Sequence, residues 1–168
     1  MIGNDVVDLQ LAAVESNWRR RGYLDKLFSP AEQQLIAQAV DQHRMVWLLW
    51  SAKEAAYKII HRDTRERTYA PLKYEVRLSG ADTGFIQYAD RVFPFRTVVS
   101  GSCLHTVAVA SGSWWPRVVY RLQPAVELLK DKDGVPSLNT GAGGLRPASV
   151  SHHGKYRKIV CLRDLPIK

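Results

Sequence analysis

The 168-residue chain is long enough for one sizeable core or two small lobes, and its 46% hydrophobic and 24% charged residues are typical of a folded globular protein. No apolar run approaches the length of a membrane span, and the first eight residues carry carboxylates where a signal peptide needs basic and then apolar residues. These features predict a cytoplasmic protein with no membrane partner, and the net charge of +8 predicts an acidic or phosphate-rich one.

The first predicted element is a short buried strand over residues 2–9, in which Gly3 allows another backbone to approach closely. Asp5 stands in the middle of this apolar stretch. Because burying a free carboxylate is costly, Asp5 must be paired, hydrogen-bonded or bound to a cation. The alternative is that Asp5 only caps or turns the chain, a role also open to Asp8.

Helices follow the strand. Residues 11–27 favour a helix with a weak pattern, and Ser29, Pro30 and Glu32 form a helix start with a capping box. The capping role is a sufficient explanation for Glu32. We expect one helix over residues 30–42 and another over residues 44–61.

The helix over residues 44–61 has an ordinary apolar face and an unusual flank. Helical spacing places on the apolar face Met45, Leu48, Ala52, Ala55, Ala56 and Ile59. The flank away from it carries Trp47, Trp50, Glu54 and Lys58. One interpretation is a surface ion pair beside incidental tryptophans. The other is a partly dry cleft, in which a carboxylate and an ammonium group can bind a metal or transfer protons.

The second half of the chain is predicted to be rich in strands, at residues 74–78, 84–88, 92–95 and 104–110. Residues 112–116 mark a boundary, so we expect lobes over residues 1–112 and 113–168. Composition predicts a loop over residues 130–148, with a turn at Asp133-Gly134, and a final strand ending at Leu162. Cys103 and Cys161 lie in apolar runs without metal-binding spacing, which predicts buried free thiols.

The basic residues form three clusters, at residues 19–21, 62–67 and 155–158. No cluster is interleaved with aromatic residues, and no helix-turn-helix or zinc-finger spacing is present, so we expect no nucleic-acid partner. Any one cluster can also be solvated surface charge.

Five segments together resemble the 4'-phosphopantetheinyl transferases, whose pattern is G-x-D, F-x-x-x-E, W-x-x-K-E-A-x-x-K, G-x-P and S-x-S-H. The matching segments are Gly3-Asn4-Asp5, residues 28–32, residues 50–58, Gly134-Val135-Pro136 and residues 149–152. The third match, from Trp50 to Lys58, is complete.

The resemblance implies an α+β fold with a strand, three helices and an antiparallel sheet, followed by a second, smaller lobe. Family members build their sites either between subunits or within one chain. About 40 strand-like residues, 72–112, separate the early motifs from the late ones, so a homo-oligomer and a single-chain site both stay open.

The resemblance also implies an activity: transfer of the phosphopantetheine arm of coenzyme A to a serine of an acyl or peptidyl carrier protein, with release of adenosine 3',5'-bisphosphate. Mg²⁺ would bind Asp5 and Glu54, with Val7 at the position of a third carboxylate in some members, so that a water or Asp8 takes that place. Glu54, directly or through a metal-bound water, would accept the serine proton, and Lys58 would stabilise or protonate the leaving phosphate oxygen.

Further residues take their roles from the resemblance. Coenzyme A would contact Lys53, Lys58, Ser151, His152, Gly134 and Pro136. Because carrier proteins are acidic as a class, Arg19, Arg20 and Arg21 are candidates for carrier docking at the rim of the cleft, and a solvated helix face is the alternative. A nucleic-acid-binding protein and a coenzyme A-binding protein without transfer activity stay as alternatives.

Overall fold

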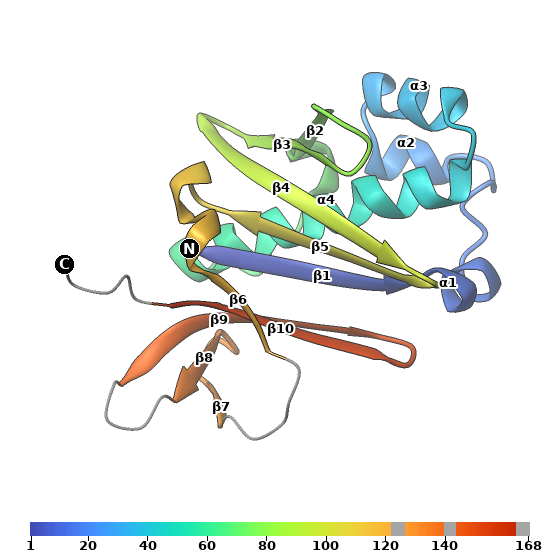
Figure 1. Ribbon diagram of the computed structural model, residues 1–168. Coiled ribbons are helices and arrows are strands. Elements are labelled where there is room, and N and C mark those ends of the chain that lie inside the picture. The colour runs from blue at the N-terminus through green and yellow to red at the C-terminus, as the bar shows by residue number, and fades with distance from the viewer. Residues whose placement is uncertain (122–126, 140–143, 164–168) are drawn as a thin grey trace.

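The computed structural model describes residues 1–121, 127–139 and 144–163, which form two five-stranded sheets with helices against one of them (Figure 1). The strand orders are β1-β5-β4-β3-β2 and β6-β10-β9-β8-β7, and every described pairing is antiparallel. The strands of the first sheet are β1 (Ile2–Asp8), β2 (Glu75–Leu78), β3 (Thr83–Tyr88), β4 (Arg91–Ser100) and β5 (Cys103–Val109). Those of the second are β6 (Val118–Arg121), β7 (Leu128–Lys130), β8 (Pro136–Asn139), β9 (Leu145–His153) and β10 (Tyr156–Leu162).

The α-helices of the described ranges all lie between β1 and β2 in the sequence. They are α1 (Leu9–Glu15), α2 (Tyr23–Leu27), α3 (Pro30–Gln38) and α4 (Gln42–Thr64), and two short 3₁₀ helices follow as η1 (Pro71–Lys73) and η2 (Gly112–Arg117). The helix expected over residues 11–27 is two short helices, α1 and α2. The capping box at the start of α3 is confirmed, because Ser29 Oγ accepts from Glu32 N and Glu32 Oε2 accepts from Ser29 N.

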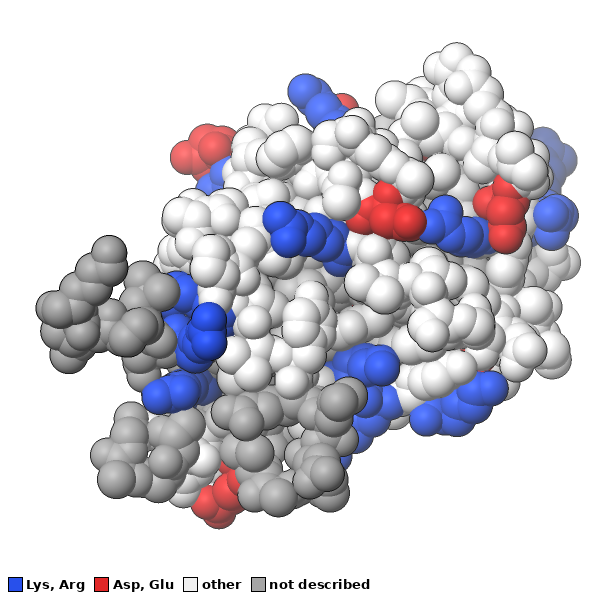
Figure 2. Space-filling view, in the orientation of Figure 1, with Lys and Arg blue, Asp and Glu red and all other residues white. Residues whose placement is uncertain are grey.

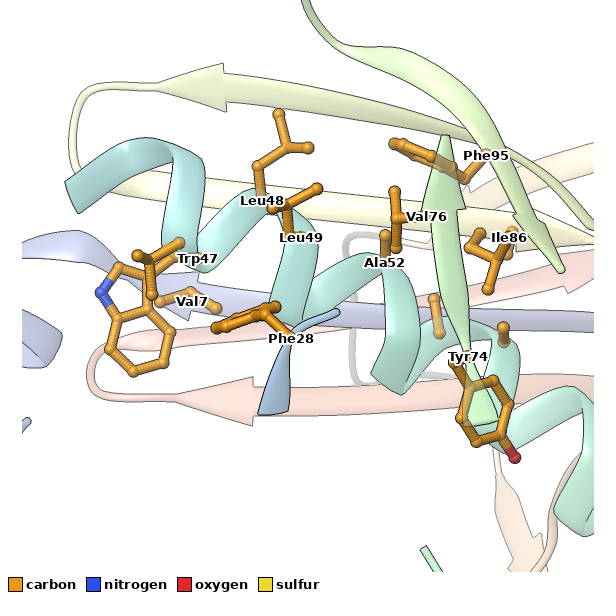
Figure 3. Close-up of a cluster of buried hydrophobic side chains, with 14 of the residues drawn as sticks. Val7, Phe28, Trp47, Leu48, Leu49, Ala52, Tyr74, Val76, Ile86 and Phe95 are labelled. Carbon is orange, nitrogen blue, oxygen red and sulfur yellow. The ribbon is translucent and has the colours of Figure 1, made fainter. Parts of the chain in front are cut away.

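Helix α4 packs along one face of the first sheet and supplies more of the main core than any other described element (Figure 3). The expected apolar face is confirmed: Leu48, Ala52, Ala55, Ala56 and Ile59 are completely buried. Their partners in the sheet include Val76, Ile86 and Phe95. Burial of this stripe is the main reason that the sequence forms so long a helix.

Strands β1 and β5 are covered on both faces. A second core lies on the side away from α4, where Ile2 and Val107 meet Val160 and Leu162 of β10. Figure 1 shows the second sheet lying beside β1, with β9 and β10 next to it. The lobe boundary at residue 112 stays a prediction.

The loop expected over residues 130–148 is wrong in part, because β8 and the start of β9 fall within it. Leu138 and Ala148 are buried against Cys161, so tertiary pairing overrides a composition rich in glycine and proline. The turn at Asp133-Gly134 is confirmed: Gly134 N donates to Asp131 O, and Gly134 has a φ of 79°. Cys103 and Cys161 are buried free thiols, as expected.

The α+β fold class is confirmed. Within the ranges described above, no helix has both the length and the apolar composition that crossing a membrane requires.

Candidate functional site

The cleft begins where α4 crosses β1 at Gly3. A Cβ atom at this position would lie 2.0 Å from the carbonyl oxygen of Ala55, so only glycine allows this approach. The expected close approach is confirmed, and it sets the next turns of α4 directly over Asp5.

Asp5, Glu54 and Lys58 come together at this crossing. Lys58 Nζ donates to Asn4 O at 2.7 Å and lies 3.4 Å from Asp5 Oδ1 and 3.5 Å from Val150 O, so it joins α4 to both β1 and β9. Burial raises the pKa of Glu54 to about 7; the Asp5 carboxylate adds to the rise, and Lys58 opposes it. These three groups therefore interact electrostatically in a partly desolvated site, which agrees with the predicted cleft.

The two carboxylates share a pocket, here called the carboxylate pocket, whose walls include Trp47, Trp50 and His152. Trp47 also belongs to the main core and is only 8% exposed (Figure 3). Trp50 makes an edge-to-face contact with Tyr69, with ring centroids 5.6 Å apart. The helix flank carrying the tryptophans is therefore covered by the protein itself, and the simple surface ion pair is wrong.

A second pocket, here called the basic pocket, adjoins the first and shares His152 with it. Its walls carry the side chains of Lys58, His61, Arg62, Lys130 and His152, and no Asp or Glu among the described residues. Gly134 and Pro136 form another part of the wall, as expected. The arrangement suits an anionic ligand.

Arg62 fixes the wall of the basic pocket and is itself occupied. Its guanidinium group donates to the carbonyl oxygens of Pro136 and Ala148, and it is 9% exposed. These bonds tie α4 to β8 and β9. Among the described residues of the basic pocket, His61, Lys130 and His152 are therefore the side chains left to bind a ligand, beside Lys58, whose shortest bond is to Asn4 O.

Lys53 lies away from both pockets, which does not fit the expected contact with coenzyme A. Its side chain is completely buried, and Nζ donates to Glu32 Oε2 at 2.7 Å, to Leu27 O at 2.8 Å and to Pro71 O at 3.1 Å. Glu32 is buried as well and also accepts from Val76 N. All three ammonium donors are thus used within the fold, so Lys53 anchors α3 and η1 to α4.

Ser151 faces β1 rather than either pocket. Its hydroxyl accepts from Val6 N at 3.0 Å and donates to Asp5 Oδ1 at 2.8 Å, and the residue is 6% exposed. The expected contact with a coenzyme A phosphate does not fit this placement, because the single hydroxyl proton is already used. The adjacent His152 is exposed and lines both pockets, so it can contact a ligand.

Asp8 does not reach the carboxylate pocket, so the alternative of Asp8 as a further metal ligand is wrong. Its Oδ1 accepts from Gln10 N and caps α1, and its Oδ2 lies against Gly154 at the β9–β10 turn. Val7 packs into the main core beside the pocket.

Several residues at the cleft were missed by sequence reasoning. His61 and Lys130 line the basic pocket, and Tyr57 stacks on His61 with ring centroids 5.8 Å apart. Tyr69 packs against Trp50 and Tyr57, and its buried hydroxyl has no hydrogen-bond partner within the described ranges. Burial, followed by the charges of Glu54 and Asp5, raises the pKa of Tyr69. Helical spacing from Lys58 could have indicated His61, one turn further along α4.

The exposed arginines at residues 19–21 lie near the tryptophan end of the cleft. Arg19 stacks on Trp18 at 4.0 Å and lines a shallow pocket with His43. The ring of His43 lies edge-on to Trp47 at 6.1 Å, which connects this surface to the carboxylate pocket. On the face seen in Figure 2, Lys and Arg form several separate groups rather than one continuous patch.

The carboxylate pair fits a hard divalent cation. Asp5 and Glu54 line one pocket, where burial first and the Asp5 carboxylate second raise the pKa of Glu54, so a cation would offset the cost of ionising both carboxylates. No group of three metal-ligating side chains lies together in the part of the chain that the structure describes. The protein would therefore supply two ligands, with water and substrate oxygens completing the octahedron that Mg²⁺ prefers.

Comparison with known proteins adds an independent observation. Residues 1–107 match the family model of the 4'-phosphopantetheinyl transferase superfamily. No curated protein matches the chain.

Similar solved structures include three holo-[acyl-carrier-protein] synthases. That of Helicobacter pylori, in complex with coenzyme A, has a TM-score of 0.54 at 17% identity, over 66% of this chain and 100% of the other. That of Neisseria meningitidis has a TM-score of 0.54 at 14% identity, and the match covers 66% of this chain and 96% of the other. That of Thermotoga maritima has a TM-score of 0.51 at 10% identity, and the match covers 82% of this chain and 80% of the other. At these identities the likeness establishes the fold alone.

Proposed function

The chain belongs to the 4'-phosphopantetheinyl transferase superfamily, and we propose that it transfers the phosphopantetheine arm of coenzyme A to a serine of an acyl or peptidyl carrier protein. The observation that carries the proposal is the convergence of Asp5, Glu54 and Lys58 between α4 and β1, beside a basic pocket. The coenzyme A complex of the Helicobacter pylori protein supports the choice of donor. We propose that the reaction depends on Mg²⁺ and releases adenosine 3',5'-bisphosphate.

Two side chains on the same flank of α4, Glu54 and Lys58, take different parts in the proposed reaction. Glu54, which lines the carboxylate pocket, accepts the proton of the carrier serine as the serine oxygen forms its bond to phosphorus. The phosphoanhydride bond to the nucleotide breaks, and Lys58 stabilises the negative charge on the leaving phosphate. A Mg²⁺ ion at Asp5 and Glu54 would neutralise charge on the pyrophosphate.

The basic pocket would hold the nucleotide end of coenzyme A. Gly134 and Pro136 form its wall, and His152 stands between it and the carboxylate pocket. His61 and Lys130 add side-chain N–H donors that the phosphates of the nucleotide would contact. In this arrangement the pyrophosphate reaches Lys58, which lines the same pocket.

The function is tested by incubating the protein with labelled coenzyme A, Mg²⁺ and one carrier protein each from fatty-acid, polyketide and peptide synthesis. Mass spectrometry of the carrier should show the added arm. Stabilisation by coenzyme A without any transfer would indicate a binding protein instead. Salt-dependent binding to random nucleic acid, with no response to coenzyme A, would favour the other alternative.

We predict that replacing Arg19, Arg20 and Arg21 by alanine raises the KM for carrier protein about threefold to tenfold at low salt. Rim charges act mainly on the rate of encounter, so the KM for coenzyme A should stay the same and the salt dependence should flatten. Steady-state kinetics at two ionic strengths would measure both effects.

A matched control removes three exposed cations from elsewhere, Lys73, Arg77 and Arg96. Arg96 stacks on Trp115 as Arg19 stacks on Trp18, so the two sets lose similar contacts. An equal rise in carrier KM for both variants would indicate an effect of net charge and would remove the three arginines from the docking surface.

A further inference from the structure

Side chains of β9 satisfy one edge of β1. Three backbone N–H groups on the edge that does not pair with β5, those of Asn4, Val6 and Asp8, donate to alternate residues of β9. Their acceptors are Ser149 Oγ at 2.9 Å, Ser151 Oγ at 3.0 Å and His153 Nδ1 at 2.9 Å. Each bond replaces the partner that a neighbouring strand would otherwise provide.

Ser151 differs from the other two because it also contacts the carboxylate of Asp5 in the carboxylate pocket. Its hydroxyl donates to Asp5 Oδ1 at 2.8 Å while its oxygen accepts from Val6 N. Lys58 Nζ lies 3.4 Å from the same carboxylate oxygen. Asp5 Oδ1 is therefore held on two sides, while Oδ2 makes no hydrogen bond to any described residue.

We propose that Ser151 is a positioning residue, which fixes the Asp5 carboxylate so that Oδ2 faces a divalent cation shared with Glu54. The inference rests on the proposed function, since it concerns the metal site of that reaction. A hydroxyl already bound on both sides cannot donate to a phosphate of coenzyme A without releasing Asp5. Partners behind a metal ligand set its orientation, and their loss typically weakens metal affinity about 10- to 100-fold.

The test compares Ser151→Ala with Ser149→Ala. Both serines are buried, both cap a β1 N–H group, and only Ser151 contacts Asp5. Both variants should therefore lose similar stability in thermal unfolding. Binding of Mn²⁺, measured by electron paramagnetic resonance on the purified chain without coenzyme A, should weaken about 10- to 100-fold for Ser151→Ala and less than about threefold for Ser149→Ala. Ser151→Thr keeps the hydroxyl and should restore Mn²⁺ affinity.

Kinetics separate the two roles of Ser151. At saturating Mg²⁺, the KM for coenzyme A of Ser151→Ala should stay within about twofold of the wild-type value, since the serine touches no substrate. A large rise in that KM, with unchanged Mn²⁺ binding, would overturn the positioning role in favour of a phosphate contact. If the wild type transfers the arm while all variants bind Mn²⁺ equally, the inference fails and the proposed function stands. If the wild type neither binds Mn²⁺ nor transfers, both fail.

Discussion

Replacement of Glu54 by glutamine is expected to lower kcat/KM for transfer by about 10²- to 10⁴-fold, the range that general acid–base groups contribute. Glutamine keeps the size of the side chain but can neither accept the serine proton nor neutralise a cation. Without Mg²⁺, the folded protein should lose no stability, because the substitution removes the repulsion that Asp5 exerts on a buried carboxylate. Glu54→Gln should therefore lose activity without a fall in its thermal unfolding temperature.

Asp5→Asn should give a comparable loss, and Asp8→Asn provides the matched control. Asp8 stands on the same strand but caps α1, and asparagine is an equally good cap. Transfer by Asp8→Asn should stay within about threefold of the wild type. Activity of Glu54→Gln within about tenfold of the wild type, or ~1.4 kcal/mol, would remove the carboxylate pair from the mechanism.

Replacement of Lys53 by methionine is expected to lower the free energy of unfolding by about 3–5 kcal/mol, the usual result of breaking a buried ion pair from one side. The buried Glu32 would keep two backbone donors but lose the one counter-charge that the described residues give it. Chemical denaturation would measure the change. The KM for coenzyme A of the folded variant should not change, because Lys53 reaches neither pocket.

The control for this substitution is Arg77→Met. Arg77 pairs with Glu75 on the surface, where its side chain is 67% exposed, so the loss should be below about 1 kcal/mol. A loss below about 1 kcal/mol for Lys53→Met as well would contradict the anchoring role. A raised KM of Lys53→Met for coenzyme A would support the contact between Lys53 and a coenzyme A phosphate that the motif implies.

The features predicted best from the sequence are those that depend on the residues of a single helix or strand. The apolar face of α4 and the capping box at Ser29 follow from spacing within a few residues, and both are confirmed. Glu54 and Lys58 were found for the same reason, since residues four apart meet on one helix. Strands β8 and β9 were missed in part, because they depend on pairing with β7 and β10 rather than on their own composition.

The site could be predicted only as far as local spacing reached. Lys53 was assigned to coenzyme A because it precedes Glu54 in the motif, but one residue along a helix turns the side chain by about 100°. That rotation takes it to Glu32, which is 21 residues away in the sequence. Ser151 was assigned from its motif too, while its actual partners are separated from it by 145 and 146 residues. No pattern within a short segment reveals such contacts.

The bonds between β1 and β9 also bear on how the chain folds as it is synthesised. The two residues joined by each N–H bond are 145 positions apart in the sequence. At a typical rate of protein synthesis of ~5–20 residues per second, β9 is therefore made about 7–30 s after β1. During this interval the free N–H groups of β1 are open to pairing with other chains, which is the usual hazard of an exposed strand edge. Contacts of such large sequence separation are slow to form. We therefore expect the cleft to mature late, so that a nascent chain with α4 already folded still lacks the chemistry of the finished enzyme.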